Sequence, residues 1–375
     1  MWITQETLPL SIIRFENVDV IFAARPKPAL DLLDQGFSRP EILQKTGLIV
    51  GVEKANLEIN KGEICVLMGL SGSGKSSLLR CINGLNTVSR GKLFVEHEGR
   101  QIDIASCTPA ELKMMRTQRI AMVFQKFALM PWLTVRENIS FGLEMQGRAL
   151  AMDADILLMD EPFCALDPLI RQGLQDELLD LQRKLHKTIV FVSHDLDEAL
   201  KLGTRIAIMK DGKIIQYSKP EEIVLNPADD YVRNFVAHTN PLNVLCAKSL
   251  MTALDRCVFA RDEYCLDTVQ NLWMVVNPPR HLTSVRKGAT PAHVQSWNPT
   301  ERIETLARQP TCVPPTTTMR DALQIRYETG HPLIVQDEAG TVLGILGDGE
   351  LYRALLGHNL SYPVLSEPAR EPSVA

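Results

Sequence analysis

The sequence predicts an α/β domain followed by a smaller α+β region. Continuous apolar runs such as Ile64–Met68 and Thr188–Val192 are typical of strands that are buried on both faces of a parallel sheet. Helical segments alternate with these runs up to about Ala237, which is the order of an α/β domain. After Pro310 a shorter strand and helix pattern begins, and it predicts a separate module.

The totals limit the kind of protein this can be. A length of 375 residues suggests two or three domains, and a net charge of -5 argues against a nucleic-acid binder. The 8 cysteines show no metal-binding or disulfide spacing. No apolar run reaches transmembrane length and no signal peptide is evident, so we expect membrane association only through a partner protein.

The α/β domain is predicted element by element from apolar patterns and breakers. Before residue 84 we expect an edge strand, a helical excursion, two strands and a helix, at Ile12–Phe22, Ala29–Thr46, Leu48–Ile59, Glu63–Met68 and Lys75–Asn83. Three buried strands and a hairpin that turns at Asp211-Gly212 follow, at Ile120–Phe124, Asp155–Met159, Thr188–Val192, Arg205–Met209 and Lys213–Tyr217.

The rest of the chain divides into a part with a weak secondary-structure pattern and a part with a clear one. The pattern from Asn240 to Thr300 predicts few clear strands. The part after Pro310 predicts a helix, two strands and a closing helix, at Thr316–Tyr327, Pro332–Gln336, Thr341–Leu346 and Asp348–Leu356. The Pro- and Glu-rich residues 361–375 are predicted to be a flexible tail.

The strongest chemical motif is the glycine-rich segment Gly69–Ser76, which has the spacing GxxxxGK[ST]. It follows a buried strand and opens a helix, which is the context that supports a phosphate-binding loop. Backbone N–H groups and the helix N-terminus would surround phosphate oxygens. We expect Lys75 to reach the β- and γ-phosphates and Ser76 to ligate Mg²⁺. The expected nucleotide contacts in this segment are Gly69, Ser71, Gly72, Ser73, Gly74, Lys75, Ser76 and Ser77.

Polar residues also follow three of the other predicted strands. Asp160 and Glu161 end the run Ile156–Met159, where open α/β sheets bind ligands, and they suit a Mg²⁺ ligand and a general base. His194 could sense the γ-phosphate, although a lone histidine is more often structural. Gln125 could reach the metal or the attacking water, although alone it reads as a surface residue.

In this order these features resemble the ABC ATPase family, over about residues 12–237. The resemblance implies ATP and Mg²⁺ as cofactors and a fold of ABC type. It makes Gly69–Ser76 the Walker A loop, Gln125 the Q-loop residue, Asp160 the Walker B aspartate, Glu161 the catalytic glutamate and His194 the switch histidine. It further implies a D-loop at Ala165-Leu166-Asp167 and an adenine-stacking aromatic at Phe22.

A narrower resemblance is to the importer branch for glycine betaine, proline and choline. Its marks are the insertion before Walker A and two later segments, at residues 29–36, 45–48, 127–131 and 167–171. The resemblance implies a quaternary-amine-transporting ATPase that serves osmoprotection and works as a homodimer. Its partners would be a membrane permease and a separate substrate-binding protein. The subunit would lie at the cytoplasmic face of the plasma membrane, held there by the permease.

The region after Pro310 resembles a CBS module, which is either regulatory or a dimerisation appendage. We therefore expect an ABC ATPase domain at residues 1–237, a linker or degenerate CBS-like copy at 238–308, a CBS-like module at 309–360 and the tail at 361–375.

One departure from the family is large. The signature loop Leu-Ser-Gly-Gly-Gln, which the family carries before Walker B, is absent, and a few dozen residues are missing at a joint near Gly147 and Arg148. The helical subdomain is thereby truncated. We expect a chain that binds Mg-ATP but hydrolyses it poorly as a homodimer, because the signature's donors stabilise charge on the γ-phosphate. An error in the sequence or gene model would produce the same joint, and resequencing the codons there distinguishes the two.

Overall fold

The computed structural model describes residues 11–124, 134, 137, 154–164, 166–237, 240, 242 and 244–356. Gln125, residues 127–131, Ala165, the joint at 147/148 and the tail at 361–375 lie outside the described residues. The chain forms two compact units, residues 1–239 and 240–375, and each is described by itself. Among the described residues no helix has the length and apolar character that crossing a membrane requires.

The first unit begins with a four-stranded antiparallel sheet of order β2-β1-β4-β5. Its strands are Ser11–Phe22 (β1), Ile49–Asn60 (β2), Arg90–His97 (β4) and Arg100–Asp103 (β5). The prediction that β1 is an edge strand is wrong, because β1 pairs with β2 on one side and with β4 on the other. The partner β4 was missed by the sequence analysis, so β1 was left without its second neighbour.

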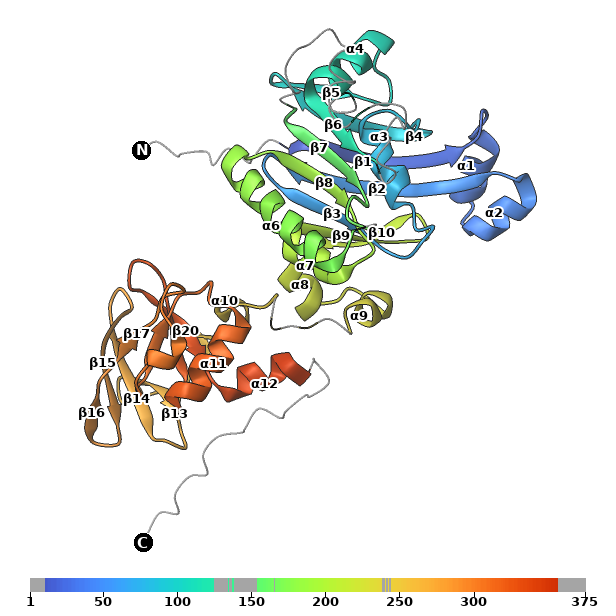
Figure 1. Cartoon of the computed structure of the whole chain (residues 1–375). Coiled ribbons are helices and arrows are strands. Elements are labelled where there is room, and N and C mark those ends of the chain that lie inside the picture. Colours follow the sequence, from blue (N-terminus) through green and yellow to red (C-terminus); the bar gives the residue numbers. More distant parts are fainter. Residues whose placement is uncertain are drawn as a thin grey trace, which may run out of the picture. The chain divides into compact units, whose positions relative to one another are not determined.

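The second sheet of this unit has six strands in the order β10-β9-β3-β8-β7-β6 (Figure 1). The strands are Ile64–Met68 (β3), Ile120–Val123 (β6), Ile156–Asp160 (β7), Thr188–Val192 (β8), Arg205–Lys210 (β9) and Lys213–Ser218 (β10). All neighbours are parallel except the hairpin β9–β10. The predicted parallel α/β sheet and its closing hairpin are therefore confirmed.

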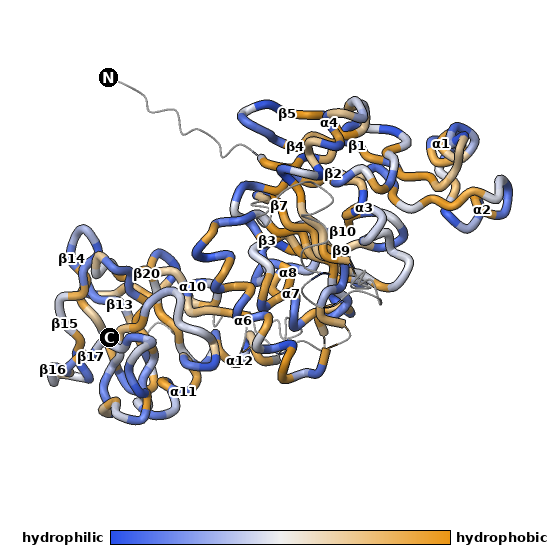
Figure 2. Tube along the Cα trace, turned by 45° about the horizontal axis from the view of Figure 1, so that its top comes forward, coloured by the Kyte–Doolittle hydropathy of each residue, from blue (hydrophilic) through white to orange (hydrophobic). Residues whose placement is uncertain are grey.

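Helices cover both faces of the six-stranded sheet. Helix α3 (Lys75–Ile82) lies between the two sheets, where Leu78 and Leu79 share a core with Cys65 and Leu67 of β3. Helices α6 (Pro168–Leu185) and α7 (Leu196–Leu202) lie on the opposite face (Figure 1). Shorter helices are Pro109–Met114 (α4), Pro220–Leu225 (α8) and Asp230–Val236 (α9). Figure 2 shows apolar residues concentrated on the strands of this sheet.

The predicted helical excursion before β2 consists of two short helices, Lys27–Asp34 (α1) and Arg39–Thr46 (α2). Leu33 and Ile42 are buried with Ile21 and Val50 in a small core of their own. A capping box of Ser38 and Glu41 begins α2. The insertion is thus a packed element on the ends of β1 and β2 and not an irregular loop.

The second unit contains two five-stranded sheets. The first, of order β11-β20-β19-β18-β17, consists of Thr252–Ala253 (β11), Gln295–Ser296 (β17), Thr311–Val313 (β18), Leu333–Gln336 (β19) and Val342–Leu346 (β20). Helices α10 (Ala247–Leu250), α11 (Met319–Thr329) and α12 (Asp348–Leu356) accompany it. The predicted helix, strand pair and closing helix after Pro310 are confirmed.

The second sheet of this unit is a meander of Phe259–Ala260 (β12), Glu263–Asp267 (β13), Leu272–Asn277 (β14), His281–Lys287 (β15) and Thr290–Ala292 (β16). The prediction of few clear strands between Asn240 and Thr300 is therefore wrong. Leu266, Leu272 and Met274 share one core with Ile334 and Ile345 of the other sheet. Residues 259–292 are thus packed into the second unit and do not form a linker.

Candidate functional site

The glycine-rich loop lies between the fully buried β3 and helix α3. Gly69 has φ 140, and a Cβ there would lie 2.1 Å from the carbonyl oxygen of Met209 in β9. Gly74 has φ 104, and its Cβ would lie 2.4 Å from the carbonyl oxygen of Gly51 in β2. Only glycine fits these positions. The loop is consequently held between strands of both sheets of the first unit.

Lys75 is buried at the centre of this loop, with 6% of its surface exposed. Its Nζ donates hydrogen bonds to the carbonyl oxygens of Gly69 at 2.8 Å and Leu70 at 3.1 Å. Burial lowers the pKa of Lys75, and the negative charges of Glu161 and Asp160 oppose that shift. An anion in front of the loop would offer the ammonium group stronger acceptors than these two carbonyls.

Asp160 ends β7 in front of α3 and is 1% exposed. One carboxylate oxygen accepts from Ser76 Oγ at 2.7 Å, and the other accepts from Arg80 Nη2 at 2.8 Å. Ser76 and Asp160, both predicted as metal ligands, are therefore in direct contact. Hydroxyl and carboxylate oxygens are the hard ligands that Mg²⁺ takes, so these residues fit the ion.

Arg80 was not among the site residues predicted from the sequence. The signal for it was available, because Arg80 follows Ser76 by four residues and the two therefore share one face of α3.

Glu161 and His194 follow β7 and β8, which are neighbouring parallel strands. The backbone N–H of Glu161, at φ 48, donates to the carbonyl oxygen of Val192 at 3.1 Å. His194 Nδ1 lies 3.8 Å from Glu161 Oε2. The structure thus brings the predicted general base and the predicted sensor histidine together at the carboxyl end of the sheet.

A cavity of about 550 Å³ opens in front of these residues. Its walls come from the loop, α3 and the two strand ends, and consist of Ser71, Gly72, Gly74, Lys75, Ser76, Ser77, Glu161 and His194. Gly69 and Ser73 of the loop do not line this cavity, and the buried Oγ of Ser73 has no hydrogen-bond partner among the residues that the structure describes. The cavity places a cation, three serine hydroxyls, a carboxylate and an imidazole around one space.

Phe22 ends β1 and is 48% exposed. Its ring lies against Gly51, where an added Cβ would be 2.7 Å from Phe22 Cε2 and 3.4 Å from Ser77 Oγ. The aromatic ring therefore lies near Gly51 and the start of α3, and its contact with adenine stays a prediction.

Arg39 of α2 was also missed by the sequence analysis. It donates to the carbonyl oxygens of Val50 at 2.7 Å and Gly72 at 3.1 Å. No motif marks it, since it belongs to the insertion, and only the folded structure brings it to the loop.

The comparisons with known proteins identify the family. The sequence profile described as "ABC transporter" matches residues 52–149, and the one described as "CBS domain" matches residues 303–357. The glycine betaine transport ATP-binding protein OpuAA of Bacillus subtilis is 36% identical, over 96% of this chain and 97% of that protein. The chain belongs to the family of ABC transporter ATP-binding subunits. Its α/β fold and its capacity to bind a nucleotide follow from that membership, and the second profile shows a C-terminal CBS domain.

Two further relatives agree. The glycine betaine/proline betaine transport system ATP-binding protein ProV of Escherichia coli is 43% identical over 64% of this chain and 69% of its own. The glycine betaine/carnitine transport ATP-binding protein GbuA of Listeria monocytogenes is 34% identical over 94% of this chain and 99% of its own. The alignment with the Bacillus protein spans 409 positions, which exceeds the 375 residues of this chain. That relative therefore contains residues without a counterpart here.

Proposed function

We propose that this chain is the energising subunit of an importer for quaternary amines of the glycine betaine class, and that it binds ATP with Mg²⁺ in the 550 Å³ cavity. The observation that carries the proposal is the convergence of Lys75, Ser76 and Asp160 at the carboxyl end of the six-stranded sheet. The names of the relatives, which include glycine betaine, proline betaine and carnitine systems, support the substrate class.

Each residue has a role in this proposal. The ammonium of Lys75 binds the β- and γ-phosphates, and Ser76 and Asp160 hold the metal ion, which neutralises phosphate charge when it is bound. Glu161 accepts the proton of the attacking water, and His194, 3.8 Å away, contacts the γ-phosphate. Gln125 contributes to the metal site or orients the water. Phe22 stacks on the adenine.

The partners follow from the same proposal. A transmembrane permease binds the subunit at the cytoplasmic face of the membrane, and a separate substrate-binding protein selects the amine. Two copies of the ATPase subunit act together. Choline and proline-type osmoprotectants belong to the same proposed substrate class.

Co-expression with a glycine betaine permease and its substrate-binding protein tests this function. We expect the chain to co-purify with the permease, and vesicles containing all three proteins to accumulate labelled glycine betaine when ATP is present on the side of the subunit. Lys75→Ala is the matched control and abolishes accumulation. Stable co-purification without ATP-dependent accumulation contradicts an energising role.

A second candidate is a nucleotide-binding regulatory protein that hydrolyses ATP poorly. The observation in its favour is the lack of a signature loop together with an alignment that is longer than the chain. The ABC transporter profile also stops at residue 149, before β7 begins at Ile156. A full-length partner that supplies the signature in trans would restore turnover, so ATPase activity is measured with and without OpuAA-type subunits added.

A further inference from the structure

We infer that Arg39 is a positioning residue of the ATP site and that the insertion α1–α2 thereby forms part of that site. The inference rests on the proposed ATP binding. Arg39 begins α2, outside every motif of the phosphate loop. Its guanidinium group joins two backbone carbonyls, one in β2 and one in the loop itself.

The contact acts on one peptide group. The peptide between Gly72 and Ser73 has its carbonyl oxygen held by Arg39 Nη1 at 3.1 Å. Its N–H donates to the carbonyl oxygen of Leu70 at 3.1 Å. With both polar atoms engaged, this peptide cannot rotate without losing two hydrogen bonds. A rotation would turn the Gly72 carbonyl oxygen toward the carbonyl oxygen of Leu70, which also accepts from Lys75 Nζ at 3.1 Å. The repulsion between the two oxygens would displace Leu70 and with it the ammonium group that faces phosphate.

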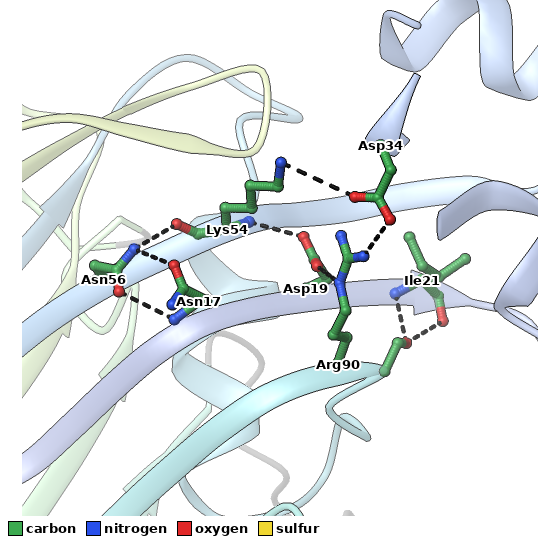
Figure 3. A network of polar contacts seen from close by, with 8 residues as sticks. Asn17, Asp19, Ile21, Asp34, Lys54, Asn56 and Arg90 are labelled. Atoms are coloured by element: carbon green, nitrogen blue, oxygen red, sulfur yellow. Dashed lines mark hydrogen bonds and ion pairs between the residues drawn. The ribbon is translucent and has the colours of Figure 1, made fainter. Parts of the chain in front are cut away.

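Ion pairs and a small apolar core hold the insertion α1–α2 against the strands of the first unit. The backbone that carries Arg39 is therefore rigid. Asp34 at the end of α1 accepts from Arg90 Nη1 at 2.7 Å, and Arg90 Nε donates to the buried Asp19 at 2.6 Å (Figure 3). Asp19 in turn accepts from the backbone N–H of Lys54 at 2.8 Å. On the other side, Leu33 and Ile42 are buried against Ile21 and Val50.

The second carbonyl that Arg39 binds connects it to the adenine side. Val50 precedes Gly51, whose backbone supports the ring of Phe22 and approaches Gly74 of the loop. The guanidinium group therefore links β2, which lies against the ring of Phe22, to the glycine-rich loop that is proposed to bind phosphate. A planar fork with several donors can bind two separate carbonyls, and a single ammonium group is poorly suited to do so.

The test separates the phosphate half of the site from the adenine half. A fluorescent trinitrophenyl-ATP is bound to the full chain and displaced by ATP or by inorganic tripolyphosphate. We expect Arg39→Ala to weaken the binding of both competitors at least about tenfold, because the hydrogen bond of a charged group to the Gly72 carbonyl is lost. Phe22→Ala should weaken the binding of ATP and leave the affinity for tripolyphosphate unchanged. Lys45→Ala removes the same charge from the same helix, and it should change neither the affinity for ATP nor that for tripolyphosphate.

Two more variants make the outcome decisive. Arg39→Lys keeps the charge, and we expect it to bind both competitors several-fold more weakly than the wild type does. Arg39→Gln replaces the alanine variant if that variant is recovered in low yield. Wild-type affinity for tripolyphosphate in the alanine or glutamine variant overturns the inference, as does full recovery with lysine. Failure of the wild type to bind the fluorescent nucleotide overturns the proposed function instead.

Discussion

The six-stranded sheet of the first unit and the meander β12–β16 of the second differ in how much of each strand is buried. Every residue of β3 and β8 is buried, because helices cover both faces of that sheet. Strand β15 buries only Val285 among its seven residues. The sheet with two covered faces carries the predicted chemistry at its carboxyl end, whereas the meander provides one apolar face for the core of its own unit.

The largest expected effect tests whether ATP affinity resides in the first unit alone. Lys75→Ala removes a buried ammonium group, and losing one partner of a buried charge pair costs about 2–5 kcal/mol. We therefore expect ATP affinity to fall at least about 30-fold. Isothermal titration measures it, and Lys61→Ala on the exposed surface is the control. Wild-type affinity in Lys75→Ala would place the nucleotide elsewhere, with the second unit as the first candidate.

A pair of core variants tests whether the two units, each represented by one of these sheets, unfold separately. Leu67 in β3 is 1% exposed and Leu272 in β14 is 0% exposed. Truncation of either leucine to alanine is expected to lower the free energy of unfolding of its unit by about 2–5 kcal/mol. Hydrogen exchange should accelerate in the strands of the altered unit and remain unchanged in the other unit. Acceleration in both units from a single substitution would show that they unfold together.

The sequence predicted the strands of the first unit better than those of the second for a physical reason. Ile64–Met68 and Thr188–Val192 are continuous apolar runs, and such runs stand out without knowledge of their neighbours. The meander has short strands in which buried and exposed positions do not alternate regularly, as in β13 with Leu266 as its one buried residue. Its burial depends on Cys312 and Ile334, which are distant in sequence.

The same distinction applies to the site. The loop, the carboxylates and His194 were predicted because each follows a recognisable strand. Arg39 was not, since its acceptors are backbone atoms of residues 50 and 72, and no side-chain pattern records such a contact. Arg80 was overlooked although helical spacing marks it. The role of Gln125, outside the described residues, stays a prediction.

A medium effect is expected for the metal ligand. Asp160→Asn removes the negative charge that faces Ser76 and Arg80. We expect Mg²⁺ to raise the ATP affinity of the wild type and to raise that of the variant several-fold less. ATP binding in the presence of EDTA serves as the control and should change little. An equal magnesium effect in both proteins would remove Asp160 from the metal site.

The smallest effect belongs to the second unit. Burial lowers the pKa of His331 below its ordinary value of 6.5, and Lys287 and Arg326 add to the shift. Between the lowered pKa and 6.5 the unfolded state binds more protons, so the free energy of unfolding rises with pH across that window. His331→Gln should flatten this rise for the second unit, as urea denaturation at several pH values would show. An unchanged slope would mean that His331 titrates normally.

Steady-state ATP hydrolysis by the purified chain tests the central claim most directly. The cavity is expected to bind Mg-ATP, while the missing signature loop leaves developing charge on the γ-phosphate without its opposing donors. We therefore predict saturable ATP binding and slow hydrolysis by the chain alone, which is lost in Glu161→Gln. Turnover of the chain alone at rates ordinary for ABC subunits would contradict this prediction.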